Sequence, residues 1–295
     1  MDTLSHKAGF IHLLGRPNVG KSTLFNHLIK RTLAITTPKA QTTRQPLVGI
    51  YSGYDYQAVY MDTPGYIKPS YPLQQAMMHK VMRSMPGSDI CVWVVDVKDQ
   101  VEEDFFPKTW GRANFPSFLL INKRDLVEKE IGLSKQKAWE EVVPEGVAVN
   151  LISALCKADV KALAKKFIAL LPHHPPYYDK EMITDRPQTY ILAEIIRKAL
   201  LLHYKQEVPY SAQVEISQCV KVDEVMHITA TIYVERETQK RIVIGKKGSA
   251  LKQVGIMARK ELEDFLKEKV FLKQYVKVVP KWRANFDLLE QWGYT

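Results

Sequence analysis

The sequence predicts two domains of different classes, an N-terminal α/β domain built on a doubly wound sheet and a smaller C-terminal α+β domain. Strand-like apolar runs alternate with helical patterns through residues 1–171, and a proline-rich stretch follows at residues 172–186. Residues 187–295 then show the order helix, strand, strand, helix, helix, strand. The length of 295 residues, with 46% hydrophobic and 25% charged residues, suits two globular domains.

The first domain alternates between apolar runs typical of strands and the apolar spacing typical of helices. The expected strands cover residues 9–14, 48–51, 56–61, 90–95, 118–121 and 147–152. The expected helices cover residues 21–29, 74–85, 105–114, 134–142 and 160–170. This alternation places helices on both faces of the sheet, and a ligand of such a fold binds at the carboxyl ends of its strands.

The second domain begins after the prolines at 172, 175 and 176, where the chain to Pro187 is expected to be an extended linker. A helical stripe covers 189–204, and strands at 211–220 and 225–234 form an antiparallel pair around a turn at 221–224. A short helix leads to a glycine-rich loop, and a helix at 250–267 and a strand at 270–279 complete the domain.

A phosphate-binding loop follows the first expected strand. Residues 15–22 read GRPNVGKS, a full match to the G-x-x-x-x-G-K-[ST] pattern, and a helical pattern begins directly after it. Gly15 and Gly20 let the backbone wrap a phosphate, Lys21 reaches the β- and γ-phosphates, and the Ser22 hydroxyl binds Mg²⁺ at a helix N-terminus. The loop predicts a nucleoside triphosphate as ligand.

The third expected strand runs into the sequence DTPG at residues 62–65. We expect Asp62 to hold Mg²⁺ through water and the Gly65 N–H to bond the γ-phosphate only while it is present, so the segment after it becomes a switch. Tyr66 stands where Ras-like switches carry the glutamine that orients the attacking water. Tyr66 is therefore not assigned a catalytic role, and slow intrinsic hydrolysis is predicted.

The sequence NKRD at residues 122–125 predicts that the base of the nucleotide is guanine. The Asp125 carboxylate can accept from N1–H and the 2-amino group of guanine, whereas adenine would leave it unpaired. Asn122 would brace the loop, and the stem of Lys123 would lie along the ring. A further strand leads to Ser153-Ala154-Leu155, whose backbone N–H groups could bond guanine O6, although this triplet alone is also common in ordinary loops.

Composition excludes several classes. Three cysteines without C-x-x-C spacing and eight histidines without metal-ligand spacing predict neither disulfides nor a zinc site. No apolar stretch approaches eighteen residues, so a soluble, cytosolic protein is expected. The net charge is +10, and residues 236–283 hold 14 Lys and Arg against five Asp and Glu.

That basic window surrounds the loop Ile244-Gly245-Lys246-Lys247-Gly248. Its two glycines would bring the backbone between two helices close to a nucleic-acid backbone, and its two lysines would contact phosphates. A hydrophobic groove beside it would hold a few unpaired bases. A single G-x-x-G is weak evidence, but the element order and the local charge agree with it, and single-stranded RNA is the expected ligand.

These motifs together resemble the Era family of bacterial GTPases, which join a P-loop GTPase domain to a C-terminal type II K-homology (KH) domain. Beyond the nucleotide motifs, family-like sequences occur at residues 40–44 (AQTTR), 183–186 (ITDR), 194–197 (EIIR), 209–211 (PYS) and 243–248 (VIGKKG). The resemblance covers nearly the whole chain.

The resemblance implies a GTP-hydrolysing switch that binds the single-stranded 3′ region of small-subunit ribosomal RNA and assists maturation of the 30S subunit. It also implies peripheral association with the inner membrane, and we expect a monomer. By family position Thr43 is the Mg²⁺ ligand of the first switch, with Thr42 as the alternative. Asn18 and residues 40–44 resemble GTPases that hold K⁺ where an arginine finger would otherwise act.

The predicted site residues fall into four groups. The catalytic group comprises Lys21, Thr43, Asp62 and Gly65, and the metal ligands are Ser22, Thr43 and Asp62. Nucleotide binding is assigned to Gly15, Asn18, Val19, Gly20, Lys21, Ser22, Thr23, Asp62, Asn122, Lys123, Asp125, Ser153 and Ala154. RNA binding is assigned to Ile244, Gly245, Lys246, Lys247, Gly248 and Lys252.

Two other functions use the same motifs. A GTPase that modifies or delivers tRNA would need chemistry in the second domain, but residues 187–295 show no catalytic Cys/His/Asp grouping. In an RNA-binding module with a purely structural nucleotide, the switch motifs would have no role. RNA affinity that changes between GTP and GDP separates this last function from the switch.

Overall fold

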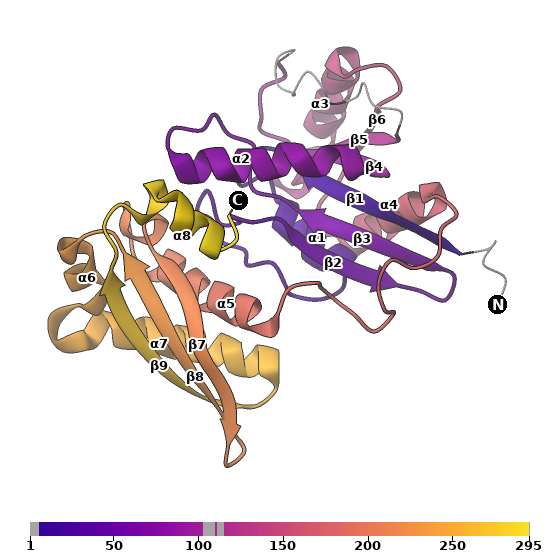
Figure 1. The fold of residues 1–295 in the computed structure, drawn as a ribbon. Coiled ribbons are helices and arrows are strands. Elements are labelled where there is room, and N and C mark those ends of the chain that lie inside the picture. The colour runs from indigo at the N-terminus through magenta and orange to yellow at the C-terminus, as the bar shows by residue number, and fades with distance from the viewer. Residues whose placement is uncertain (1–5, 103–109, 111–114, 295) are drawn as a thin grey trace. The chain divides into compact units, whose positions relative to one another are not determined.

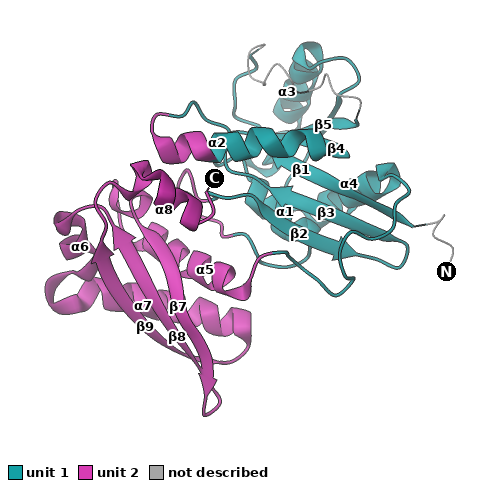
Figure 2. Cartoon of the chain, in the orientation of Figure 1, with its two compact units in different colours: residues 1–34, 43–69, 77–185 teal, residues 35–42, 70–76, 186–295 magenta. Residues whose placement is uncertain are grey.

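The computed structural model describes residues 6–102, 110 and 115–294. Its contacts divide the chain into two compact units (Figure 2). The first unit comprises residues 1–34, 43–69 and 77–185, and the second comprises residues 35–42, 70–76 and 186–295. Two short segments of the N-terminal half therefore group with the C-terminal unit.

A six-stranded sheet in the order β2-β3-β1-β4-β5-β6 forms the centre of the first unit (Figure 1). Its strands are β1 (Lys7–Leu14), β2 (Leu47–Ser52), β3 (Tyr56–Asp62), β4 (Ile90–Asp96), β5 (Ser117–Asn122) and β6 (Ala148–Leu151). β3, β1, β4, β5 and β6 are parallel, and β2 pairs antiparallel with β3. β4 is buried along nearly its whole length, which explains why it is a continuous apolar run rather than an alternating one.

In the described part of the chain, four helices accompany this sheet: α1 (Lys21–Leu28), α2 (Pro72–Ser84), α3 (Lys129–Val142) and α4 (Lys157–Leu170). α1 packs against α4 and β3, and α3 packs against β6. The chain orders of the strands and helices confirm the predicted P-loop α/β fold. The helix expected at 105–114 lies outside the described residues, apart from Trp110, which is buried.

The proline-rich segment after α4 is irregular but is hydrogen-bonded to the first unit. The buried side chain of Gln57 on β3 accepts from the backbone N–H groups of Tyr177 and Tyr178 at 2.8 and 2.9 Å and donates to the Tyr178 carbonyl at 2.9 Å. The Ile50 N–H donates to the Ile183 carbonyl at 2.8 Å. These bonds hold the segment along the strands, so it is more ordered than a free linker.

The second unit contains a three-stranded sheet in the order β7-β8-β9. Its main elements are α5 (Gln188–His203), β7 (Gln213–Val222), β8 (Val225–Val234), α6 (Glu237–Ile244), α7 (Ser249–Leu266), β9 (Lys269–Val278) and α8 (Phe286–Gln291). β7 and β8 are antiparallel, with a bulge between Ile216 and Gln218, whereas β8 and β9 are parallel. α5 packs on β7 and α7 on β9. The predicted element order is confirmed.

The structure differs from the sequence prediction in detail. α3 begins at Lys129, five residues before the expected start, and the final helix α8 was not expected. α8 has six residues and begins where the Asn285 side chain accepts from the Leu288 N–H at 3.2 Å, a cap too local to produce a periodic pattern. Short 3₁₀ turns cover Met85–Gly87, Arg124–Leu126, Val208–Tyr210, Lys246–Gly248 and Trp282–Ala284. Among the helices of the described residues, none is long and apolar enough to cross a membrane.

Candidate nucleotide site and nucleic-acid interface

The phosphate loop lies between β1 and α1, where two glycines adopt positive φ. Gly15 has φ 139°, and a side chain there would lie 2.2 Å from the Val94 carbonyl oxygen. Gly20 has φ 99°, and a side chain there would lie 2.3 Å from the Asn122 amide nitrogen. Both positions therefore require glycine for conformation and for space. The loop is built to bring backbone N–H groups close to a phosphate.

Lys21 begins α1 and is folded back over the loop. Its ammonium group donates to the carbonyl oxygens of Gly15 and Arg16, both at 2.9 Å, and only 6% of its surface is exposed. Burial lowers the pKa of Lys21 to about 8, and the Asp62 carboxylate opposes part of that shift. A buried ammonium group held by two carbonyl oxygens is available to exchange them for phosphate oxygens.

Ser22, Thr43 and Asp62 converge although they come from α1, the following loop and the end of β3. The Ser22 hydroxyl donates to Asp62 Oδ2 at 2.7 Å, the Thr43 hydroxyl does so at 3.1 Å, and the two hydroxyl oxygens are 3.0 Å apart. The second carboxylate oxygen, Oδ1, is buried without a hydrogen-bond partner in the described structure. Two hydroxyl oxygens and a carboxylate oxygen suit Mg²⁺, which takes oxygen ligands.

The electrostatics of this cluster suit a bound cation. Burial raises the pKa of Asp62 above its ordinary value, against the opposing effects of Lys21 and the two hydroxyl groups. An unpaired oxygen on a buried carboxylate is costly, and a divalent ion would stabilise its charged form. Thr42 lies elsewhere: its hydroxyl donates to the Lys39 carbonyl at 2.7 Å and lies 2.7 Å from the Thr37 hydroxyl. The geometry therefore favours Thr43 over Thr42 as the ligand.

Gly65 lies directly against the phosphate loop. A side chain there would come within 2.6–2.8 Å of Pro17, so only glycine permits this approach. The next residue, Tyr66, donates its N–H to the Gly15 carbonyl at 2.9 Å, and its ring packs edge-on against Trp93 with centroids 5.5 Å apart. Tyr66 thus joins the segment after Gly65 to the phosphate loop through its backbone and packs its ring on the core.

Asn122 links the base-recognition loop to two other loops. Its side chain is 1% exposed, donates to the Val19 carbonyl at 2.8 Å and accepts from the Ala154 N–H at 2.8 Å. Lys123 donates to the Asn18 carbonyl at 2.7 Å and forms an ion pair with Asp96 at 2.6 Å. Asp125 follows on the same turn with an exposed side chain. The hydrogen bonds of Asn122 and Lys123 thus fix the loop, and the Asp125 carboxylate lies at the surface.

The loop at residues 153–155 is also fixed by hydrogen bonds to side chains of other elements. Asp159 accepts from the Ser153 N–H at 2.8 Å and pairs with Arg124 at 2.6 Å. The Ala154 N–H is engaged by Asn122, as above. Guanine O6 would therefore have to share or displace these bonds, a constraint that the motif alone did not reveal. Of the remaining nucleotide candidates, Asn18 is exposed, Val19 is buried and Thr23 is half-buried.

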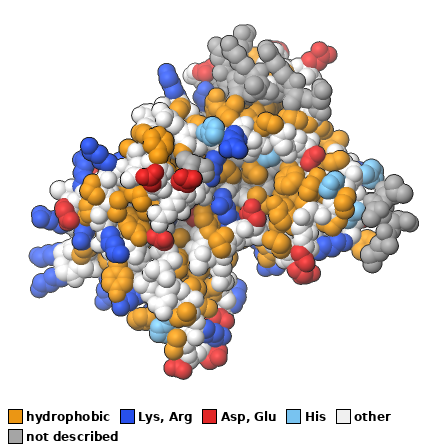
Figure 3. Space-filling view, viewed as in Figure 1, with side chains coloured by type: hydrophobic (Ala, Val, Ile, Leu, Met, Phe, Trp, Pro, Cys, Tyr) orange, Lys and Arg blue, Asp and Glu red, His pale blue; other side chains and the backbone are white. Residues whose placement is uncertain are grey.

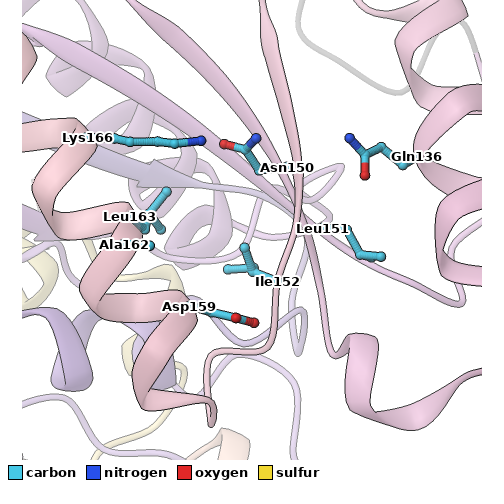
Figure 4. Close-up of a pocket in the computed structure, with 8 residues that line it drawn as sticks. All are labelled: Gln136, Asn150, Leu151, Ile152, Asp159, Ala162, Leu163 and Lys166. Carbon is cyan, nitrogen blue, oxygen red and sulfur yellow. The ribbon is translucent and has the colours of Figure 1, made fainter. Parts of the chain in front are cut away.

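A cavity of about 270 Å³ adjoins this loop at the edge strand β6 (Figure 4). Asn150 and Ile152 face α4, and Leu151 lies toward α3, from which Gln136 extends (Figure 4). Asp159, which holds the Ser153 N–H, also lines the cavity. The phosphate loop, the candidate Mg²⁺ ligands and Asp125 do not line it, so the cavity is not the candidate nucleotide site.

The second candidate interface is the loop between α6 and α7. Gly245 has φ 72° and Gly248 φ 79°, and a side chain on Gly245 would lie 2.6 Å from Ala250. Lys246 and Lys247 between them are exposed, as is Lys252 one turn into α7, while Ile244 before them is half-buried. The glycines shape a backbone turn, and the cations project from it, which is the arrangement expected for contacts with a nucleic-acid backbone.

The family comparisons match parts of both domains. Residues 10–123 match the family model described as 50S ribosome-binding GTPase, and residues 207–283 match the KH domain model. GTPase Era of Halothermothrix orenii is 36% identical over 99% of both chains, and that of Lactobacillus delbrueckii subsp. bulgaricus is 40% identical over 99% of this chain and 97% of its own. The chain belongs to the Era family of GTPases.

Solved Era structures have the same fold over the full chain. Era in complex with MgGDPNP and nucleotides 1506–1542 of 16S ribosomal RNA superposes with a TM-score of 0.91 at 33% identity, covering 98% of this chain and 99% of its own. A tyrosine-to-alanine variant of Aquifex aeolicus Era bound to GDP and AlF4⁻ gives the same values. Because the similarity extends over nearly the whole chain, it confirms the predicted pairing of a P-loop GTPase domain with a KH domain in this Era protein.

Sequence reasoning missed the supporting pairs of the Era nucleotide site. Asp96 and Asp159 hold Lys123 and the Ser153 N–H, and neither belongs to a nucleotide motif. Asp96 could have been found, because it ends β4 at the same sheet edge as Asp62 and Asn122. Asp159 lies in the first turn of α4 and carried no comparable signal.

Proposed function

We propose that this protein hydrolyses GTP as a switch, binds the single-stranded 3′ region of small-subunit ribosomal RNA and assists maturation of the 30S subunit. The observation that carries the proposal is the convergence of the Ser22 and Thr43 hydroxyls on Oδ2 of the Asp62 carboxylate, whose other oxygen is buried without a hydrogen-bond partner in the described structure. The related Era complex that holds both MgGDPNP and 16S ribosomal RNA supports the pairing of nucleotide with RNA.

In the proposed reaction water attacks the γ-phosphate of GTP, and GDP and phosphate leave. Lys21 would neutralise charge on the β- and γ-phosphates, and the Gly65 N–H would bond the γ-phosphate. Ser22 and Thr43 would hold Mg²⁺ directly, and Asp62 would hold it through water. Tyr66 offers no side-chain amide near the attacking water, which supports slow intrinsic hydrolysis.

We also propose K⁺ as an activating ion, because no arginine among the described residues is assigned as an arginine finger. The support is the exposed Asn18, held with φ 63° at the phosphate loop, together with residues 40–44. Hydrolysis measured in KCl and in NaCl at equal ionic strength tests this. A rate equal in the two salts would remove K⁺ from the mechanism.

The RNA proposal rests on Gly245, Gly248 and the three exposed lysines at 246, 247 and 252. In this reading the loop clamps the RNA backbone and bases lie beside it, as in other KH domains. The protein would act as a monomer in the cytoplasm. Peripheral association with the inner membrane remains a prediction of the family resemblance.

Coupling between nucleotide and RNA is supported by how residues 35–42 are held. These residues group with the second unit, whereas Thr43 groups with the first. Arg197 on α5 is 1% exposed, donates to the Thr42 carbonyl and pairs with Glu194 at 2.7 Å through Nε. Burial opposes the charge of Arg197, but Glu194 outweighs it and raises the pKa of Arg197 above its ordinary value.

Thr42 is thus fixed within the second unit, and its chain neighbour is the proposed Mg²⁺ ligand. A nucleotide that draws Thr43 toward the metal must also act on Thr42, since one peptide bond joins them. This covalent path supports the proposal that GTP and GDP set different RNA affinities.

The direct test is the affinity for a 3′-terminal small-subunit RNA oligonucleotide at fixed salt, first with a non-hydrolysable GTP analogue and then with GDP. Tighter binding with the analogue is expected. Equal binding in both states would overturn the switch, and absent binding would overturn the RNA assignment.

A matched variant locates the coupling. Arg197→Lys keeps the positive charge but shortens the side chain and removes the forked donors that hold Glu194 and the Thr42 carbonyl together. GTP hydrolysis is expected to persist while the ratio of RNA affinities in the two nucleotide states moves toward one. An unchanged ratio would exclude Arg197 from the coupling path.

A further inference from the structure

The exposed face of β9 carries cations and aromatic rings in strict alternation. Lys269, Phe271, Lys273, Tyr275 and Lys277 point outward, and the residues between them are buried or half-buried. Phe271 is 54% exposed and Tyr275 43% exposed. Because side chains alternate across a strand, these five residues lie in one row on one face of the sheet.

The row is part of a wider surface shared with β8. Phe271 pairs with His227, whose ring centroid lies 5.0 Å away, and Lys273 pairs with Thr229. The Lys273 ammonium lies 5.2 Å from the centroid of the Tyr275 ring. Phe271 and Tyr275 are four residues apart, about 13 Å along a strand. Two ring platforms are therefore separated by one cation.

The helices of this unit pack on the opposite face. α7 packs on β9, and a side chain at Gly255 of α7 would lie 2.7 Å from Gln274, which points inward. The glycine-lysine loop joins α6 to α7 and so belongs to the helical layer. The row on β9 is a separate surface from that loop.

The surface has limits at both ends. At one end of the strands the ring of Trp292 packs on Tyr233 with centroids 5.2 Å apart. At the other end the β7–β8 turn carries Asp223 and Glu224, which repel a polyanion. Figure 3 shows lysine and arginine side chains along the side of this unit that carries α6 and β9, and acidic side chains at the tip of the β7–β8 hairpin.

We propose that the outer face of β9 is a second nucleic-acid contact, on which unpaired RNA bases stack on Phe271 and Tyr275 while Lys269, Lys273 and Lys277 contact phosphates. Aromatic faces accept any base, and a row of cations follows a phosphate backbone, so the chemistry is that of a sequence-tolerant single-strand platform. The inference rests on the proposed function only in taking RNA as the ligand.

Charge complementarity favours RNA over a second copy of the chain. Protein interfaces are depleted in lysine, and two copies of this face would bring rows of three lysines together. A single-stranded polyanion instead neutralises those cations while its bases cover the exposed rings. The neighbouring strand β7 carries Glu215, which accepts from the Tyr233 hydroxyl at 2.8 Å. Because an acidic side chain repels a polyanion, the RNA is expected to follow β9.

Two oligouridylates distinguish the two RNA surfaces. A KH loop clamps about four nucleotides, so a 4-mer is expected to occupy the loop alone, whereas a 12-mer can extend further. In the double variant Phe271→Ala with Tyr275→Ala, the 12-mer affinity is expected to fall at least about fivefold and the 4-mer affinity to be unchanged. Lys273→Glu should lower the affinity for the 12-mer and reduce the dependence of that affinity on salt.

Matched controls are available in the same unit. Phe286→Ala removes an aromatic side chain that is 63% exposed on α8, and Lys260→Glu reverses an exposed charge on α7. Both variants should bind the 12-mer as the unaltered protein does. Ultraviolet crosslinking of the bound 12-mer should also yield adducts on a peptide containing Phe271 or Tyr275.

Each other outcome overturns the inference. Unchanged 12-mer affinity in the double variant, with no crosslink on β9, would exclude the platform. A dimer in sedimentation that the double variant abolishes would make the face a self-interface. Loss of binding to phosphatidylglycerol vesicles with RNA binding intact would make it a lipid surface. Failure of the proposed function would give a different result. In that case variants of the loop between α6 and α7, with Lys246 and Lys247 changed to Asp, would still bind the 4-mer.

Discussion

The two glycine-lysine loops of this chain use the same residues in opposite environments. In the phosphate loop Lys21 is 6% exposed and is held by two carbonyl oxygens. In the loop between α6 and α7, Lys246 and Lys247 are exposed, and Lys247 has the left-handed φ of 50°. Both loops lead into helix N-termini, yet only the first is surrounded by positioned polar groups.

The difference indicates two modes of anion recognition. A buried cation within a fixed set of partners distinguishes one ligand from its near relatives, because any mismatch leaves buried groups unpaired. Exposed cations act through screened attraction and displaced counterions, which suits a long polyanion of variable sequence. The predictions that follow test whether chemical selectivity belongs to the nucleotide site and salt sensitivity to the loop between α6 and α7.

The largest expected effect is on base selectivity. Asp125→Asn keeps the volume but turns one acceptor into a donor that faces the donors of guanine. The preference for GTP over ATP is expected to fall by up to about 10⁴-fold. Xanthosine triphosphate, which has a carbonyl oxygen in place of the 2-amino group, should gain affinity. Competition binding with the three nucleotides measures this, and an unchanged preference for GTP would remove Asp125 from the site.

Removing the buried cation should weaken nucleotide binding without changing base preference. Lys21→Met retains the apolar stem and loses the ammonium group that bonds Gly15 and Arg16. A hydrogen bond to a charged group contributes about 1.5–3 kcal/mol, so the Kd for GTP should rise at least about tenfold. Calorimetry with GTP measures the loss, and RNA binding without nucleotide serves as the control. A variant with ordinary GTP affinity would contradict the assigned role of the buried lysine.

The exposed loop should respond to charge and salt. Changing Lys246 and Lys247 to Asp should abolish RNA binding at physiological salt and leave GTP hydrolysis intact. Each lost phosphate contact lowers the slope of log affinity against log salt by about 0.9 for duplexes and 0.7 for single strands. Titrations of RNA at several KCl concentrations give that slope. Retained affinity would exclude this loop from the interface.

The sequence was sufficient for features that depend on backbone geometry and spacing. Gly15, Gly20 and Gly65 occupy positions that other residues cannot, and the motifs that contain them lie at strand ends. It was insufficient where distant side chains meet. The engagement of the Ser153 and Ala154 N–H groups by Asp159 and Asn122 depends on packing between separate elements, which no local pattern encodes.

The same limit explains the proline-rich segment after α4, which belongs to the first unit. Its prolines predicted an extended chain, and the irregular backbone agrees. The side chain that fixes it, Gln57, lies on a strand more than a hundred residues earlier and bonds Tyr177 and Tyr178 through their backbones. Periodicity cannot reveal a buried glutamine whose partners are backbone groups of a distant loop.

The smallest expected effect is a pH dependence that belongs to Lys21. Burial lowers its pKa to about 8, below the ordinary value of 10.5, so between these two pH values the native state without nucleotide has released a proton that an ordinary lysine keeps. Nucleotide binding requires the charged form, and affinity should therefore fall by up to about tenfold per pH unit in that window. Magnesium-GDP titrations between pH 7.5 and 9.5 measure the slope.

The unfolding free energy should move in the opposite direction over the same window. Where the unfolded chain binds more protons than the native one, stability rises with pH, so Lys21 should add up to about 1.4 kcal/mol per pH unit to the nucleotide-free protein as pH rises above about 8. General alkaline destabilisation would lower affinity and stability together. The Lys21→Met variant should lose both slopes, and a variant that kept them would assign the titration to another group.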